Sequence, residues 1–241
     1  MISIKILNCI TTKMKVLAFD TETTGLPENM NAPMIDSAKW PHIIQLSFIL
    51  FDTEQKEILE YSDHIIKLAG TIPISPASIA IHQITRERCD REGIHIRAAL
   101  LEFAEAIKDA DLIVAHNLDF DKKLILAELS RQQLPNCFLR VDGLPKPQYC
   151  TMKESIEICK IPNPVKKYAE SGQPYKWPRL NELHKFLFNT EPTGTHNAIA
   201  DVMICLRAYI YLNCGYDIAT DEGVKMVFRC LYANYCGGSA P

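Results

Sequence analysis

The sequence predicts an α/β domain in which a mixed β-sheet is flanked by α-helices. Segments with the two-residue repeat of strands alternate along the chain with segments that have the 3.6-residue repeat of helices. The segment LIVA at 112–115 is wholly apolar, as expected of a strand that is buried on both faces. A chain of 241 residues is long enough to enclose one full core, so we expect one main domain.

The first half of the chain is expected to supply the strands of this sheet. An amphipathic helix over 97–109 has Ala98, Leu101, Ala104 and Ile107 or Lys108 along one side, and a second helix follows from about 118 to 132. The strands are placed at 16–20, 43–52, 63–68 and 112–115.

The second half is expected to be mostly helical. Residues 140–179 are rich in Pro, Lys and Tyr, which indicates loops around one helix at 151–159. Two helices follow, at 180–188 with Asn181 as a candidate N-cap, and at about 197–212.

These signals divide the chain into three parts. Because Met14 directly precedes the first strand, residues 1–13 are expected to be an N-terminal extension of a domain at 14–212. Residues 213–241 are expected to form a C-terminal tail with one helix, which Asp221 caps and a Gly-Gly pair ends. This helix is expected to pack on the domain, and a docking helix for a partner protein is the alternative.

The composition indicates an intracellular protein, either cytoplasmic or nucleoid-associated. Nine cysteines form no CxxC pair, which favours reduced thiols over disulfides or a zinc site. No apolar run approaches the roughly 20 residues that a membrane span needs. The net charge is −3, but residues 140–185 carry nine Lys and Arg against five Asp and Glu. This basic stretch suits contact with a phosphate chain, or it is an ordinary solvated loop.

Two carboxylates stand at the end of the first strand, in the segment DTETTG at 20–25. Asp20 and Glu22 are two residues apart, so both side chains project from the same face of the strand. Two buried acids repel each other and lose hydration, which is unfavourable unless a cation lies between them. The pair therefore predicts a divalent metal site, with a solvated acidic strand end as the plainer alternative.

A third acid, Asp121, follows the apolar strand in the segment HNLDFD at 116–121. It falls in the first turn of the next helix, where the helix dipole favours a carboxylate. Asp119 is the alternative, although the two residues point in different directions on a helix that begins near residue 118. Phe120 offers a stacking face for a base, or else it belongs to the core.

The last two candidates lie in the segment HNAIAD at 196–201. On a continuous helix, residues five apart are separated by about 140°. His196 is therefore expected in a mobile loop before the helix, after Gly194, where it can approach and leave a metal-bound water. Asp201 is expected on the helix itself, brought by small neighbours close to the Asp20–Glu22 pair. A lone histidine is usually structural, and this one is singled out by the acids around it.

These three segments together resemble the motifs of DnaQ-like 3′–5′ exonucleases of the DEDDh group. That family includes polymerase proofreading domains, RNase T and oligoribonucleases, and the resemblance covers roughly residues 14–212. It implies an RNase H-like fold with a central five-stranded mixed sheet. It also implies that Asp20, Glu22, Asp121 and Asp201 hold two divalent ions, Mg²⁺ or Mn²⁺, and that His196 is the general base.

The resemblance extends to the substrate contacts. Thr23 would hold the terminal 3′-hydroxyl, and the segment SPASIAIHQIT at 75–85 resembles a family stretch ending in IHGIT, in which His82 approaches the terminal nucleotide. Gln83 stands where that stretch has glycine. The remaining expected contacts are Asn117, Phe120 and Trp177, the last in a basic and aromatic segment at 166–179 where anchoring on the core is the alternative.

The sequence therefore predicts an enzyme that releases nucleoside monophosphates from the 3′ end of single-stranded or frayed DNA, in proofreading or repair. An exonuclease that trims RNA 3′ ends is the alternative within the family. A non-catalytic nucleic-acid-binding module is the alternative outside it. The expected partner is a single-stranded 3′ end; a DNA polymerase partner is left open, and no membrane partner is expected.

Overall fold

The computed structural model describes residues 13–29, 36–224 and 226–236. Residues 1–12 of the expected N-terminal extension therefore lie outside the described residues. The described part forms a five-stranded mixed sheet in the order β3-β2-β1-β4-β5. The central strand β1 is antiparallel to β2 and parallel to β4, which confirms the predicted α/β fold. The strands are β1 (Lys15–Thr23), β2 (Ile43–Asp52), β3 (Glu57–Ile65), β4 (Leu112–Ala115) and β5 (Gln148–Cys150).

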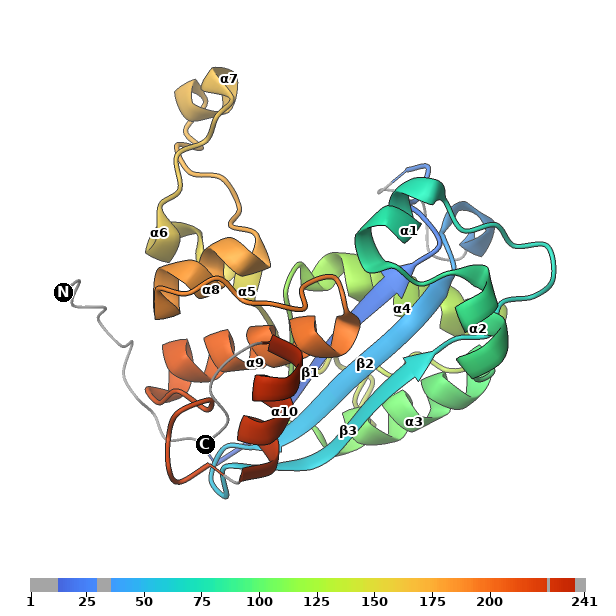
Figure 1. Cartoon of the computed structure of the whole chain (residues 1–241), viewed down its shortest axis with the longest axis horizontal. Helices are drawn as coiled ribbons and strands as arrows, with labels where there is room; N and C mark the ends of the chain where they lie inside the picture. The colour runs from blue at the N-terminus through green and yellow to red at the C-terminus, as the bar shows by residue number, and fades with distance from the viewer. Residues whose placement is uncertain (1–12, 30–35, 225, 237–241) are drawn as a thin grey trace.

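Helices cover both faces of this sheet (Figure 1). Their bounds are η1 (Ser37–Lys39), α1 (Pro76–His82), α2 (Arg86–Glu92), α3 (Ile96–Asp109), α4 (Leu118–Arg131), α5 (Thr151–Glu154), α6 (Ile156–Cys159), α7 (Lys166–Glu170), α8 (Leu180–Phe188), α9 (Ala198–Cys214) and α10 (Met226–Cys236). On β1, Leu17 and Phe19 pack in the cluster with α3 and α4, whereas Val16 and Ala18 pack in the cluster with α9 and α10. This alternation continues to Asp20 and Glu22, which are thereby directed toward the side of α9.

Several boundaries differ from the sequence-based predictions. The third strand is β3, not 63–68, because a turn at 53–56 returns the chain directly alongside β2. The region 140–179 was expected to be loops around one helix, but it also contains β5 and α7. The helix expected at 151–159 is divided at Ser155 into α5 and α6. Two further helices, α1 and α2, were not predicted.

The predicted apolar side of α3 was wrong except at Ile107. The buried side carries Leu100 and Phe103 as well as Ile107, whereas Leu101 is 46% exposed. Burying the large Phe103 ring removes more apolar surface from water than the predicted side offers. The N-cap of α8 is Arg179 rather than Asn181, because the Glu182 carboxylate accepts the Arg179 backbone N–H at 2.7 Å.

The C-terminal helix α10 begins at Met226, four residues later than a cap at Asp221 would place it. Asp221 instead pairs with the Lys56 ammonium at 3.1 Å and accepts the N–H of Gly223 at 2.8 Å. Phe228 and Tyr232 are buried in the cluster with α9, so the helix packs on the domain as predicted. Tyr235, near the end of this helix, is exposed.

Residues 160–179 form an arm that carries α7 and projects from the body of the molecule (Figure 1). A bridge between Pro162 and Tyr175 joins its two sides. Among the described residues, no helix is both long and apolar enough to cross a membrane.

Candidate active site

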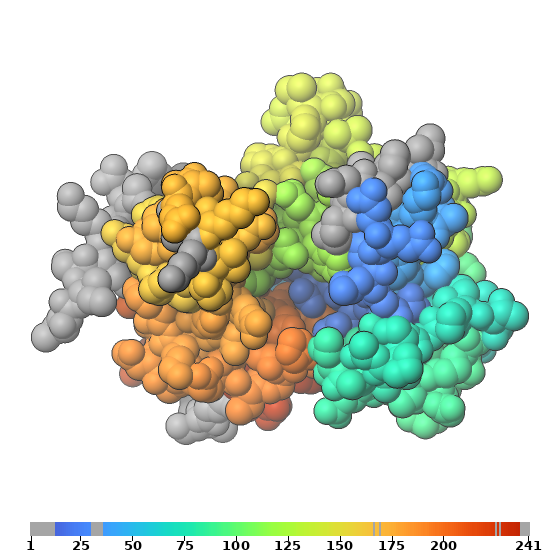
Figure 2. All heavy atoms as spheres, turned by 90° about the horizontal axis from the view of Figure 1, so that it is seen from above, coloured from blue at the N-terminus to red at the C-terminus, as the bar shows by residue number. Residues whose placement is uncertain are grey.

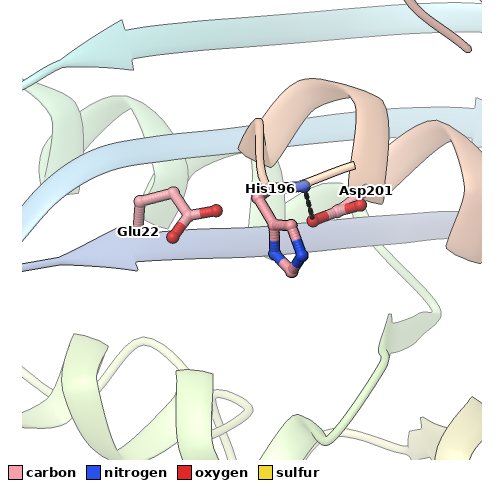
Figure 3. A group of neighbouring side chains, drawn as sticks. All are labelled: Glu22, His196 and Asp201. Atoms are coloured by element: carbon pink, nitrogen blue, oxygen red, sulfur yellow. Dashed lines mark hydrogen bonds between the residues drawn. The ribbon is translucent and has the colours of Figure 1, made fainter. Parts of the chain in front are cut away.

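Segments far apart in the sequence meet near the carboxyl end of β1. Glu22 comes from β1, Asp201 from the first turn of α9, and His196 from the loop before α9 (Figure 3). Each of these three side chains offers a ligand atom within 4.8 Å of the other two. Carboxylate oxygens and an imidazole nitrogen at this spacing are a donor set that suits a divalent cation.

Asp121 joins this group from the first turn of α4. Its side chain is 3% exposed, and its Oδ1 accepts a hydrogen bond from the Thr21 hydroxyl at 2.7 Å. Asp119, the alternative weighed from the sequence, is an exposed residue that pairs with Lys153. Of the two acids, Asp121 is therefore the one that faces the cluster.

Burial raises the pKa of all four carboxylates. Burial and then the neighbouring acids raise the pKa of Glu22 to about 8 and that of Asp20 well above its ordinary value. Burial also raises the pKa of Asp121 and of Asp201 to about 7, although hydrogen bonds from Thr21 and from the His196 backbone oppose the rise. The cluster is thus costly to ionise by itself at neutral pH, and a divalent cation among the carboxylates would offset that cost.

One atom of this cluster supports the fit of a cation directly. Asp201 Oδ2 accepts the His196 N–H at 3.0 Å, but the buried Oδ1 has no hydrogen-bond partner within the described ranges. A buried oxygen without a partner is uncommon and calls for a ligand. The donor set and this oxygen together fit a divalent cation beside Glu22 and Asp201.

His196 lies outside the helix, as the five-residue spacing predicted. Helix α9 begins at Ala198, and His196 has a left-handed backbone conformation with φ 67°. Its ring is exposed and points toward the carboxylates (Figure 3). An exposed imidazole beside carboxylates that could hold a metal ion is placed to exchange protons with a water molecule at the site.

Gln45 was not anticipated from the sequence, although it fixes the start of α9. It lies opposite Glu22 in the pairing of β1 with β2. Its Oε1 accepts the Ala198 N–H at 3.3 Å, and its Nε2 donates to Asp63 at 2.7 Å. The signal was available, because a glutamine inside the apolar run IIQLSFILFD must find hydrogen-bond partners when it is buried.

A cavity of about 390 Å³ opens next to the carboxylates, between β1, α1 and α4. Seen from above, the surface is hollowed where β1 (dark blue) lies between the α8–α9 segment (orange) and α1 (teal) (Figure 2). Its polar side includes Glu22, Thr23 and His82. Its apolar side is lined by Leu26, Ala77, Ile81 and Phe120. The volume and mixed lining are typical of a small-ligand site.

His82 supports this cavity from behind and is neutral. Its Nδ1 accepts the Ile84 N–H at 3.0 Å, so its Nε2 carries the proton and donates to the Thr23 carbonyl at 3.2 Å. Burial lowers its pKa. Gln83, which stands where the resembling stretch has glycine, ends α1 in a left-handed conformation with φ 59°. The turn that glycine would favour is therefore preserved.

The remaining predicted substrate contacts, Asn117 and Trp177, each adjoin in the sequence one of the two residues that link β4 to the arm, His116 and Pro178. His116 joins the end of β4 to the arm, because its Nδ1 meets the Thr151 hydroxyl at 2.9 Å and its Nε2 donates to the Pro178 carbonyl at 3.1 Å. Burial lowers its pKa to about 4, so the ring is neutral. Asn117 begins α4 with φ 64° and makes no side-chain cap. Trp177, beside Pro178, is 61% exposed and is therefore no core anchor.

The fold and this site together define a nuclease that depends on divalent metal ions. The RNase T family of exonucleases matches residues 17–209, so the chain belongs to this exonuclease family. The match confirms the family predicted from the three motifs, and it makes the chain an enzyme.

Solved structures of exonuclease I share the fold. One of them, described as suggesting how processivity is achieved, has a TM-score of 0.62 at 16% identity over 92% of this chain. The zinc-bound complex of E. coli exonuclease I with single-stranded DNA has a TM-score of 0.60 at 18% identity over 83% of this chain. The matches cover 44% and 41% of those chains, so this chain corresponds to less than half of them. We found no curated protein of similar sequence.

Proposed function

We propose that this protein removes nucleoside monophosphates one at a time from the 3′ end of single-stranded or frayed DNA. The observation that carries the proposal is the cluster of four carboxylates with raised pKa values, of which Asp121 is buried, placed beside an exposed histidine and a cavity. The fold shared with E. coli exonuclease I, solved in complex with a dT13 oligonucleotide, supports the choice of a DNA strand.

The four acids divide the work with the histidine. Asp20, Glu22, Asp121 and Asp201 would hold two divalent ions, Mg²⁺ or Mn²⁺, which when bound neutralise charge on the attacking and leaving oxygens. His196 Nδ1 or Nε2 accepts the proton of the attacking water, since the exposed imidazole lies beside the carboxylates and a ring nitrogen can accept a proton. The Asp201 carboxylate also fixes the His196 backbone through its N–H at 3.0 Å. Asp201 would thus both bind metal and hold the backbone of His196 in place.

The cavity gives the reaction its preference for a strand end. Thr23 Oγ1 donates its proton to the Gly25 carbonyl at 2.6 Å, so its lone pairs are left to accept a proton from a terminal 3′-hydroxyl. The Phe120 ring and the exposed side chain of Leu26 offer apolar faces for the terminal base. An internal nucleotide carries a phosphate in place of the 3′-hydroxyl, and the described residues that line this pocket include no lysine or arginine to receive it.

The upstream strand would pass the arm. Trp177 offers an exposed face for stacking on a base, and His116 holds the neighbouring Pro178 in place. Lys176 forms an ion pair with Glu182 at 2.6 Å. Phosphate contacts are therefore expected from other basic residues, such as the exposed Lys167. An intracellular location, a role in proofreading or repair and a polymerase partner remain predictions of the sequence.

End-labelled oligonucleotides test the proposal. Purified protein with Mg²⁺ or Mn²⁺ is expected to shorten single-stranded DNA in single-nucleotide steps, and Asp20→Asn is expected to abolish the reaction. Shortening that proceeds equally with Asp20→Asn or with excess chelator would refute it. Matched DNA and RNA strands decide between DNA degradation and RNA 3′-end trimming. Metal-dependent turnover of either strand excludes a non-catalytic binding module.

A further inference from the structure

The C-terminal helix α10 touches the loop that carries His196. The N–H of Thr193 donates to the carbonyl of Cys236, the last residue of α10, at 3.0 Å. The Cys236 thiol lies 3.5 Å from the carbonyl of Ala200 in the first turn of α9. The end of α10 therefore contacts the chain on both sides of His196.

The closest contact is at Gly194, two residues before His196. A Cβ atom added to Gly194 would lie 2.1 Å from the carbonyl oxygen of Tyr235, a distance at which backbone must move. Gly194 also has φ +72°, a conformation that side chains disfavour. Only glycine lets the loop pass this close beneath the last turn of α10.

A buried polar network fixes α10 in this position. The Tyr232 hydroxyl accepts a hydrogen bond from Arg207 of α9 at 2.7 Å and lies 2.7 Å from His184 Nε2 of α8. The same guanidinium donates to both oxygens of Asp217 at 2.7 Å. Removing one member would leave buried donors without partners, so the network resists displacement of the helix.

We propose that α10 is a positioning element for the general base, and that Gly194 and Tyr232 are its positioning residues. The helix holds the backbone at 193–194, and this backbone sets where the His196 ring stands over the carboxylates. The proposal rests on the proposed role of His196. It assigns a catalytic purpose to a helix that lies beyond residues 17–209, the part matched by the exonuclease family.

Gly194→Ala in the full chain tests the proposal. A displacement of the loop by about 1 Å is expected to lower kcat on single-stranded DNA by about a hundredfold, with KM and Mn²⁺ affinity unchanged. Gly143→Ala is the matched control, because Gly143 has φ +81° but nothing within 4 Å of an added Cβ. It imposes the same backbone strain away from the loop, and its kcat should equal that of the wild type.

The decisive readout is a double-mutant cycle with His196→Ala. If α10 acts through His196, then Gly194→Ala has no further effect on the residual activity of His196→Ala. An equal loss in both backgrounds would overturn the positioning role while leaving the proposed function intact. A fully active His196→Ala would instead overturn the role of the base itself.

Tyr232→Phe provides a second test of the proposal if Gly194→Ala does not fold. Loss of the hydroxyl is expected to lower kcat by about threefold to thirtyfold without changing KM, and again only when His196 is present. Thermal denaturation shows that each variant is folded at the assay temperature. A Tyr232→Phe enzyme that is folded and has wild-type kcat contradicts the proposal.

Discussion

Replacing Asp121 by asparagine is expected to make the protein more stable in chelator while it destroys the activity. Asp121 is 3% exposed and faces the other acids, and burial raises its pKa from 3.8 to about 7. In the unfolded chain the carboxyl has its ordinary, lower pKa. The folded state therefore binds the proton more tightly, and the stability that depends on this proton is lost as the pH rises toward the folded pKa.

The magnitude follows from the size of the shift. The folded carboxyl is protonated at about pH 5 and ionised at about pH 8. The stability is lost over the interval from about pH 5 to the folded pKa of about 7, which is about two pH units. Each unit corresponds to about 1.4 kcal/mol, which sets an upper limit of about 3 kcal/mol. Partial relaxation and sharing of protons with the other acids reduce this, so we expect about 1–3 kcal/mol.

Urea denaturation in chelator measures the effect. The stability gained by Asp121→Asn over the wild type should be larger at pH 8 than at pH 5 by that amount. Comparing the two pH values removes the pH-independent cost of placing an amide beside Thr21. Asp119→Asn is the control, since it makes the same substitution at an exposed residue of the same helix that pairs with Lys153. A gain for Asp121→Asn that is equal at both pH values, or larger at pH 5, would refute the argument.

Three further predictions concern the base, the arm and the turn after α1. His196→Ala is expected to lower turnover by about 10²–10⁴-fold with little change in Mn²⁺ affinity measured by calorimetry; unchanged turnover contradicts the role of the base. Trp177→Ala should raise KM for single-stranded DNA by about five- to hundredfold, as expected for one lost stacking contact, with kcat preserved. An unaltered KM would place the strand elsewhere. Gln83→Gly should raise the free energy of unfolding by about 0.5–1 kcal/mol because glycine adopts φ 59° without strain; a lower stability would show that the Gln83 side chain matters more than its backbone.

The long elements could be predicted from the sequence because their patterns are local. The strands β1, β2 and β4 and the helix α8 lie where apolar periodicity placed them. The shorter elements escaped for physical reasons. The three residues of β5 are only half-buried and show no alternation of apolar and polar residues. The strand β3 is largely polar, so the prediction was placed on the more apolar segment DHIIKL at 63–68. The helix α1 did carry a signal, with Ser75 as N-cap and proline at its first position.

The candidate site divides in the same way. Strand parity and helix spacing in three short motifs were enough to select Asp121 over Asp119 and to place His196 outside α9. The supports of these residues are tertiary contacts, and a local pattern does not reveal the partner in such a contact. Gln45 reaches α9 across the sheet, His116 reaches the arm, and the close approach of α10 to Gly194 joins segments about 40 residues apart. Contacts between segments so far apart in the sequence can be identified only in the three-dimensional structure.

The most direct test of the central claim is the direction of digestion. A single-stranded DNA labelled at its 5′ end should give a ladder that shortens one nucleotide at a time when a divalent ion is present. The same strand labelled at its 3′ end should release labelled mononucleotide at once. Blocking the 3′-hydroxyl with a phosphate should slow both reactions. Immediate release of the 5′ label, internal cleavage, or a rate indifferent to the state of the 3′ end would contradict the account.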